Sequence, residues 1–199
     1  MERLLSRPDA GREPPDALQA RILDAALAEF EEHGLRRVSM EDVARRARVA
    51  RTTIYRRFGT KEQLVQAVIL RECRRFLSGI AAATEGLSAE EALVEGFVAG
   101  LREARSNPLL ARVAVSEPEA FLPQLSMNGG AVMLAARDIL VERLGRDRPG
   151  ADLDGVCEVL LRVALSLLLV PGGGLAVHDD DSARAFARRH LLRLLPPPG

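Results

Sequence analysis

Signals for the start of a helix recur along this chain, and apolar residues at helical spacing follow them. In a capping box, Ser, Thr or Asp before the helix and Glu, Gln or Asp three residues later satisfy free backbone N–H groups. Such pairs occur at Asp16/Gln19, Ser39/Asp42, Thr60/Gln63, Ser88/Glu91 and Ser116/Glu119. No alternating apolar and polar pattern typical of strands accompanies them. The chain is therefore predicted to be all-α.

These signals predict about nine helices separated by short polar breaks. The expected ranges are 17–33, 39–46, 50–58, 60–84, 88–105, 107–115, 117–144, 152–170 and 180–195. Gly34 is expected to end the first helix in the left-handed conformation. The most apolar run, 163–170, is far shorter than the roughly 20 residues that span a bilayer, so a buried helix without membrane contact is expected there.

The pattern divides the chain into three parts. Residues 1–15 are polar and contain proline, and they are expected to form a disordered arm. A small bundle is expected over 16–76 and a larger helical bundle over 77–199. The arm lacks the apolar segment of a secretory signal, and Cys73 and Cys157 form no disulfide or metal-binding pattern, which favours a cytoplasmic protein.

Basic residues concentrate in one short segment of a chain whose formal net charge is zero. Residues 35–61 contain nine Lys and Arg residues against two acidic ones, so this segment carries +7 and the remainder −7. A basic head on an acidic body is typical of a protein that meets a polyanion at one end. Charge alone, however, favours a solvated arginine-rich surface.

The basic segment contains two short predicted helices joined by a tight turn, which is a helix-turn-helix pattern over 39–58. At about 100° per residue, Ile54 and Phe58 share one face of the second helix, and this face is expected to pack inward. Thr52 and Arg56 then project from the opposite face. The second helix therefore presents hydroxyl groups and a guanidinium outward.

The outward side chains suit the major groove of DNA. Arginine donates a bidentate pair to guanine, and threonine contacts base edges or a thymine methyl group. A tyrosine hydroxyl and marginal arginines suit phosphates, as do Ser39 and Lys61 at two helix starts. The candidate DNA-binding residues of this kind are Ser39, Arg51, Thr52, Thr53, Tyr55, Arg56 and Lys61.

Residues 22–69 resemble the N-terminal domain of TetR-family transcriptional regulators. The matching positions are Ile22, Leu23, Ala25, Ala26, Phe30, Gly34, Ser39, Val43, Ala44, Ala47, Val49, Thr53, Ile54, Tyr55, Phe58, Lys61 and Leu64. The resemblance implies that 16–76 form a three-helix helix-turn-helix DNA-binding domain. It also implies that 77–199 form a helical bundle that binds a small effector and dimerises.

Two residues depart from the family pattern. Arg48 replaces the glycine of the turn, and a non-glycine residue in the left-handed conformation costs on the order of 1 kcal/mol. Ala50 replaces the serine that caps the second helix, which loses about 1 kcal/mol of capping. Either the turn has another geometry, or the head is less stable and Arg48 compensates through a phosphate contact. Arg48 is therefore added to the candidate DNA-binding residues.

The C-terminal part offers apolar side chains for the two functions that the resemblance implies. Met and Phe line adaptable apolar cavities, and they fit an ordinary core equally well. The candidate effector-binding residues are Phe97, Leu101, Phe121, Met127 and Met133. Apolar stripes on the last two long helices give the candidate dimer-interface residues Leu160, Val163, Leu167, Phe186, His190 and Leu194.

No catalytic or metal-binding constellation is visible in the sequence, because the three histidines are scattered and no nucleophile–base pattern occurs. No cofactor is expected. The sequence favours a ligand-responsive repressor that binds double-stranded DNA as a homodimer on a palindromic operator and responds to a small apolar or amphipathic effector. The alternatives are a ligand-independent architectural DNA-binding protein and a helical-bundle enzyme with an incidental helix-turn-helix.

Overall fold

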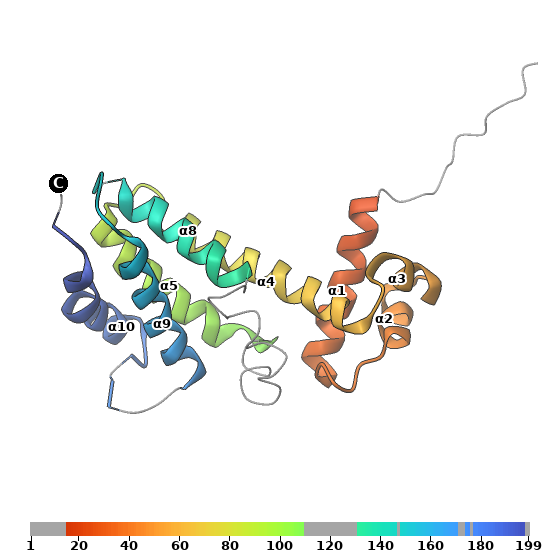
Figure 1. Ribbon diagram of the computed structural model, residues 1–199. Coiled ribbons are helices and arrows are strands. Elements are labelled where there is room, and N and C mark those ends of the chain that lie inside the picture. Colours follow the sequence, from red (N-terminus) through yellow and green to blue (C-terminus); the bar gives the residue numbers. More distant parts are fainter. Residues whose placement is uncertain (1–14, 110–130, 147, 171–173, 176, 198–199) are drawn as a thin grey trace, which may run out of the picture. The chain divides into compact units, whose positions relative to one another are not determined.

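The computed structural model describes residues 15–109, 131–146, 148–170, 174–175 and 177–197 (Figure 1). All regular elements within these ranges are helical, which confirms the predicted all-α class. The chain divides into two compact units, with the boundary after Val68. None of the helices in the described ranges has the length and apolar character needed to cross a membrane.

The N-terminal unit contains α1 (Pro15–His33), α2 (Met40–Ala47), α3 (Arg51–Phe58) and the beginning of α4 (Lys61–Ala83) (Figure 1). α1 packs against α2, and α2 packs against α3. The side chains that fill this core come from all four helices and the loop after α1. They include Ile22, Ala26, Phe30, Leu35, Val43, Ala44, Ile54, Phe58, Leu64 and Val68.

The predicted helix starts of this unit are confirmed at two sites. Ser39 and Asp42 form a complete capping box at α2, with each side chain accepting from the other residue's backbone N–H. Thr60 and Gln63 make the same reciprocal pair at the start of α4. Gly34 ends α1 with a φ of 85°, the left-handed conformation that the sequence predicts.

The C-terminal unit is arranged around α5 (Ala89–Ser106). α5 packs against α8 (Ala131–Gly145), α9 (Asp154–Leu169) and α10 (Asp180–Phe186) (Figure 1). The buried cluster between these helices contains Ala89, Leu93, Val94, Phe97, Val98, Leu101, Leu144, Leu153, Cys157, Leu160, Ala183, Ala187 and Leu191. Ser88 and Glu91 form the predicted capping box at the start of α5.

An arginine of α8 ties the loop between α4 and α5. Arg143 donates to the backbone carbonyl oxygen of Thr84 at 2.9 Å and to that of Leu87. Both residues lie in the loop after α4, where the N–H of Leu87 also donates to Thr84 O at 3.3 Å. Arg143 therefore supplies a charged donor to two loop carbonyls.

The last predicted helix differs from a single α-helix over 180–195. α10 is followed by a π-helical turn at Ala187–Leu191 and a short 3₁₀ turn at Leu192–Leu194. Residues four apart drift by about 40° around an α-helix, and the wider π turn reduces this drift. Ala183, Ala187 and Leu191 thereby all remain buried. The predicted helix 107–115 and the first part of 117–144, with the Ser116/Glu119 pair, lie largely outside the described residues.

Candidate nucleic-acid interface

The turn between α2 and α3 keeps a left-handed residue although it lacks glycine. Arg48 has φ 53° and ψ 46°. Its N–H donates to Arg45 O at 3.2 Å, and the N–H of Val49 donates to Ala44 O at 3.0 Å. This pair of bonds is the Schellman motif, in which the left-handed position usually holds glycine. Of the two explanations open from the sequence, a different turn geometry is therefore wrong.

The second helix of the motif begins without a side-chain cap. Ala50 precedes α3 in an extended conformation and has no side-chain acceptor for the first turn, where its backbone oxygen alone accepts from Thr53 N at 2.9 Å. Ile54 and Phe58 are buried, with exposed fractions of 0% and 8%, which confirms the predicted inward face. α3 ends at Phe58, and Gly59 follows it with φ 71° and ψ −70°. Residues with a Cβ rarely adopt this conformation, so glycine is favoured between α3 and α4.

The predicted outward face of α3 is exposed. Arg51, Thr52, Tyr55 and Arg56 are all exposed, and Thr53 is half-buried. Arg51 lies over the ring of Tyr55, with its guanidinium carbon 5.1 Å from the ring centroid, and donates to the Tyr55 hydroxyl at 3.3 Å. Four side chains able to contact bases or phosphates therefore share one solvent-facing surface, which we call the reading face (Arg51, Thr52, Tyr55 and Arg56).

An acidic residue of α2 holds one member of the reading face. Glu41 Oε1 lies 2.6 Å from Arg51 Nε, although 61% of the Arg51 side chain and 44% of the Glu41 side chain are exposed. The hydrogen bond to Tyr55 and the charge of Glu41 raise the pKa of Arg51, so its positive charge is secure. Sequence spacing does not reveal this pair, because Glu41 and Arg51 lie on different helices.

The basic residues of the segment 35–61 fall into two groups. Most have partners within the protein: Arg45 with Asp42, Arg46 with Glu29 and Glu32, Arg57 with Gln19, and Lys61 with the carbonyl oxygen of Arg36. Arg37, Arg48 and Arg56, by contrast, make no side-chain hydrogen bond or ion pair with any described residue. The formal charge of +7 therefore overstates the number of cations that are free for a ligand.

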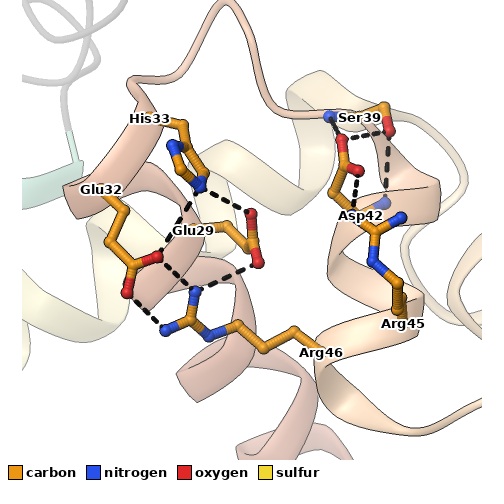
Figure 2. Close-up of polar contacts among 7 residues, drawn as sticks. All are labelled: Glu29, Glu32, His33, Ser39, Asp42, Arg45 and Arg46. Carbon is orange, nitrogen blue, oxygen red and sulfur yellow. Dashed lines mark hydrogen bonds and ion pairs between the residues drawn. The ribbon is translucent and has the colours of Figure 1, made fainter.

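Figure 2 shows how Arg46 joins α2 to α1. Its guanidinium donates to Glu29 at 3.1 Å and to Glu32 at 2.6 Å, and His33 lies 3.8 Å from Glu29. Glu29 is buried, with 11% of its side chain exposed. The hydrogen bond from Arg46 lowers the pKa of Glu32. Arg46 thus serves the packing of the N-terminal unit.

Two of the predicted phosphate contacts already have internal partners. The hydroxyl of Ser39 donates to Asp42 Oδ2 at 2.6 Å within the capping box (Figure 2). Lys61 Nζ donates to Arg36 O at 2.9 Å, and Lys61 is the first residue of α4. Both residues lie on the helix-turn-helix unit, but a phosphate would have to share or replace these contacts.

The candidate effector-binding residues that the structure describes are buried. Phe97 and Leu101 belong to the core cluster around α5, where Phe97 stacks on Phe186 with ring centroids 5.7 Å apart. Met133 of α8 is buried as well. Phe121 and Met127 lie outside the described residues. An open hollow of about 590 Å³ elsewhere on this unit has a charged lining that includes Arg102, Arg105 and Asp179.

The candidate dimer-interface residues differ in how deeply they are buried. Leu160 belongs to the core of its own unit, with 4% exposed. Val163, Leu167 and Phe186 are partly buried against that core. His190 is exposed and Leu194 has an exposed fraction of 39%. His190 and Leu194 are therefore the two exposed residues of this set.

Comparison with known proteins identifies the family. Residues 22–68 match the family described as bacterial regulatory proteins, tetR family, and residues 88–188 match the bacterial tetracyclin repressor C-terminal domain. The chain belongs to the TetR family. TetR-family regulators bind DNA and act as dimers, and they are transcriptional regulators rather than enzymes.

Relatives named as HTH-type transcriptional regulators match most of this TetR-family chain. An uncharacterized regulator of Mycobacterium tuberculosis is 27% identical over 178 residues, covering 89% of this chain and 85% of that protein. The regulator AlkX of the same species is 29% identical over 170 residues, covering 80% of each. The crystal structure of the TetR family repressor AlkX from Dietzia sp. superposes with a TM-score of 0.66 at 25% identity, covering 92% of this chain and 97% of that one.

Proposed function

We propose that this transcriptional regulator is a ligand-responsive repressor that binds a palindromic operator as a homodimer. In this proposal residues 16–76 form the DNA-binding domain, and 77–199 bind the effector and dimerise. The observation that carries the DNA-binding assignment is the exposed reading face on α3, opposite the buried Ile54 and Phe58. Two such helices enter successive major grooves about 34–36 Å apart.

Each part of the reading face has a distinct role in this proposal. Arg56 has no partner among the described residues and donates to guanine, while Thr52 and Thr53 contact neighbouring base edges. Arg51 and Tyr55, already held against each other, bind phosphates. Ser39 and Lys61 contribute further phosphate contacts at the margins.

The effector is a small apolar or amphipathic molecule. Phe97, Leu101 and Met133 supply an apolar environment within the C-terminal unit, and a ligand enters by displacing part of this packing. The relative from Dietzia is described as a repressor implicated in biodegradation of n-alkanes, which favours the same ligand class. An effector that binds better to a conformation with lower DNA affinity releases the operator by linkage.

The dimer forms through α9, the end of α10 and the chain that follows it. Val163, Leu167, Phe186, His190 and Leu194 offer partly or largely exposed surface there, and the same elements from a second subunit cover it. Leu160 supports this surface from beneath.

The test begins with selection of a duplex from a random library by the wild-type protein. Arg56→Ala should then weaken binding to the selected duplex by about 1–3 kcal/mol and lower the preference over a scrambled duplex, as measured by fluorescence anisotropy. Arg57→Ala is the matched control, because the neighbouring Arg57 bonds to Gln19 and should change stability more than specificity. Unchanged affinity of Arg56→Ala contradicts the base-reading role.

The same measurement separates a repressor from an architectural protein. A specific regulator should bind the selected duplex about 10³-fold or more tightly than random DNA at physiological salt, whereas an architectural protein shows little preference. Native mass spectrometry of the purified protein identifies a bound effector by its mass. Addition of that compound should then release the selected duplex.

A further inference from the structure

Arg48 is strained in a turn that does not need its side chain. It is the one non-glycine residue with a positive φ in the part of the chain that the structure describes. The bonds that close the turn, from Arg48 N to Arg45 O and from Val49 N to Ala44 O, use main-chain atoms alone. Glycine would make the same bonds without the clash between Cβ and the following carbonyl oxygen. The side chain therefore contributes nothing to closing the turn.

The side chain of Arg48 also has no role in the packing of the N-terminal unit. It is exposed and meets no acceptor among the described residues. Neighbouring cations behave differently, since Arg45, Arg46 and Arg51 each lie within 3.1 Å of a carboxylate oxygen. A strained residue that makes no contact within its own chain indicates a function outside that chain.

We infer that Arg48 binds a DNA phosphate. This contact explains why the turn contains arginine, although glycine would adopt the same backbone conformation without strain. The inference rests on the proposed function, because Arg48 lies in the turn between the two helices of the DNA-binding motif. A phosphate is the partner because Arg48 precedes α3 and does not belong to its reading face. A phosphate contact adds affinity and fixes position without reading sequence.

One internal explanation competes with this inference. A cation near the C-terminus of α2 interacts favourably with the helix dipole, which alone would favour arginine over glycine. The two explanations differ in what Arg48→Gly changes. Loss of a dipole interaction lowers stability and leaves the salt dependence of DNA binding unchanged. Loss of a phosphate contact weakens the salt dependence of DNA binding and does not lower stability.

The experiment compares Arg48→Gly, Arg48→Asn and Arg48→Lys with the wild type. Glycine and asparagine tolerate the left-handed conformation without the charge, and lysine retains the charge. The probes are a duplex selected from a random library by the wild-type protein and a scrambled duplex of equal length. Affinity for both is measured over a series of salt concentrations, and thermal unfolding is followed by circular dichroism.

Each phosphate contact contributes about 0.9 to the magnitude of the slope of log K against log salt. The magnitude of this slope should therefore fall by about 1.8 in a dimer that loses two phosphate contacts. The same relation gives a loss of roughly 60-fold in affinity at about 0.1 M salt. We expect these changes in Arg48→Gly and Arg48→Asn for both duplexes alike, and recovery in Arg48→Lys. The midpoint of thermal unfolding of Arg48→Gly should equal or exceed that of the wild type.

Two results overturn the inference while leaving the proposed function intact. One is a selected duplex that Arg48→Gly binds with the wild-type salt slope. The other is a variant that loses its preference for the selected duplex, because Arg48 would then read bases. A wild type that selects no duplex at all instead contradicts the proposed function itself.

Discussion

Glu41 of α2 holds Arg51 of α3, with 2.6 Å between Glu41 Oε1 and Arg51 Nε. The same guanidinium lies over the Tyr55 ring. Three side chains from two helices are thus ordered before any ligand arrives. Because the half-buried Glu41 side chain lies beside the reading face with 44% of its surface exposed, its negative charge also opposes the approach of phosphates. The Glu41 carboxylate therefore orders Arg51 and also repels DNA. This repulsion is offset only by a duplex that contacts the ordered side chains.

Glu41→Gln should lower sequence specificity. Removal of the charge should tighten binding to a scrambled duplex by about fivefold at most, which corresponds to roughly 1 kcal/mol. The selected duplex should gain less, because the ordered position of Arg51 is lost. Fluorescence anisotropy measures the ratio of the affinities for the selected and the scrambled duplex. Glu31→Gln on α1 removes the same charge without breaking the Arg51 pair and should leave the ratio unchanged. An equal gain for both duplexes contradicts the ordering role of Glu41.

Arg46→Met should destabilise the N-terminal unit by about 1–3 kcal/mol, because the buried carboxylate of Glu29 loses a charged donor. Methionine keeps much of the aliphatic length. Arg45→Met is the control, since the Arg45 side chain is 74% exposed and its pair with Asp42 should contribute less than about 1 kcal/mol. Urea unfolding followed by circular dichroism compares the two variants, and equal losses would contradict this assignment.

The capping box of α2 should make stability depend on pH in the acid range. Hydrogen bonds from the side chain and backbone of Ser39, assisted by Arg45, lower the pKa of Asp42 from 3.8 to about 2. Because the pKa is lower in the folded state, this carboxylate stabilises the fold above about pH 4, and the contribution is lost as pH falls toward 2. The difference in unfolding free energy between wild type and Asp42→Asn should therefore shrink over that range. If the difference in unfolding free energy between the two proteins stays constant from pH 5 to about pH 2, the stabilising role of the Asp42 carboxylate is contradicted.

Leu194→Asp should dissociate the dimer and leave each subunit folded. The side chain is 39% exposed in the single chain, so the charge meets solvent in the monomer and an apolar partner in the dimer. Leu160→Asp is the contrasting variant, because its side chain lies in the subunit's own core and should unfold that unit. Sedimentation velocity reports the oligomeric state, and circular dichroism reports the fold. A dimeric Leu194→Asp removes this residue from the proposed interface.

The fold could be predicted from sequence where the signal is local. Capping boxes need only residues three apart, and those at Ser39, Thr60 and Ser88 are confirmed. The inward positions of Ile54 and Phe58 follow from helical phase alone. The box formed by Asp179 and Ser182 at α10 was missed, because its third residue is serine and departs from the usual Glu or Gln.

The contacts of the candidate site could not be predicted in the same way. Partners such as Glu29 and Arg46 lie 17 residues apart and meet only after α1 packs on α2. The sequence therefore shows which residues of the basic segment are cations. It does not reveal which of these cations already have a partner within the protein. The same holds for Lys61, whose partner is a backbone carbonyl with no signature in the sequence.

Tyr55 gives the protein a built-in optical reporter. The chain has one tyrosine and no tryptophan, and that tyrosine stands on α3 beneath the guanidinium of Arg51. All intrinsic emission near 300 nm therefore originates from the reading face, whatever happens in the larger C-terminal unit. A change in its quantum yield or polarisation would register events on α3 alone, with no fluorophore attached to the protein.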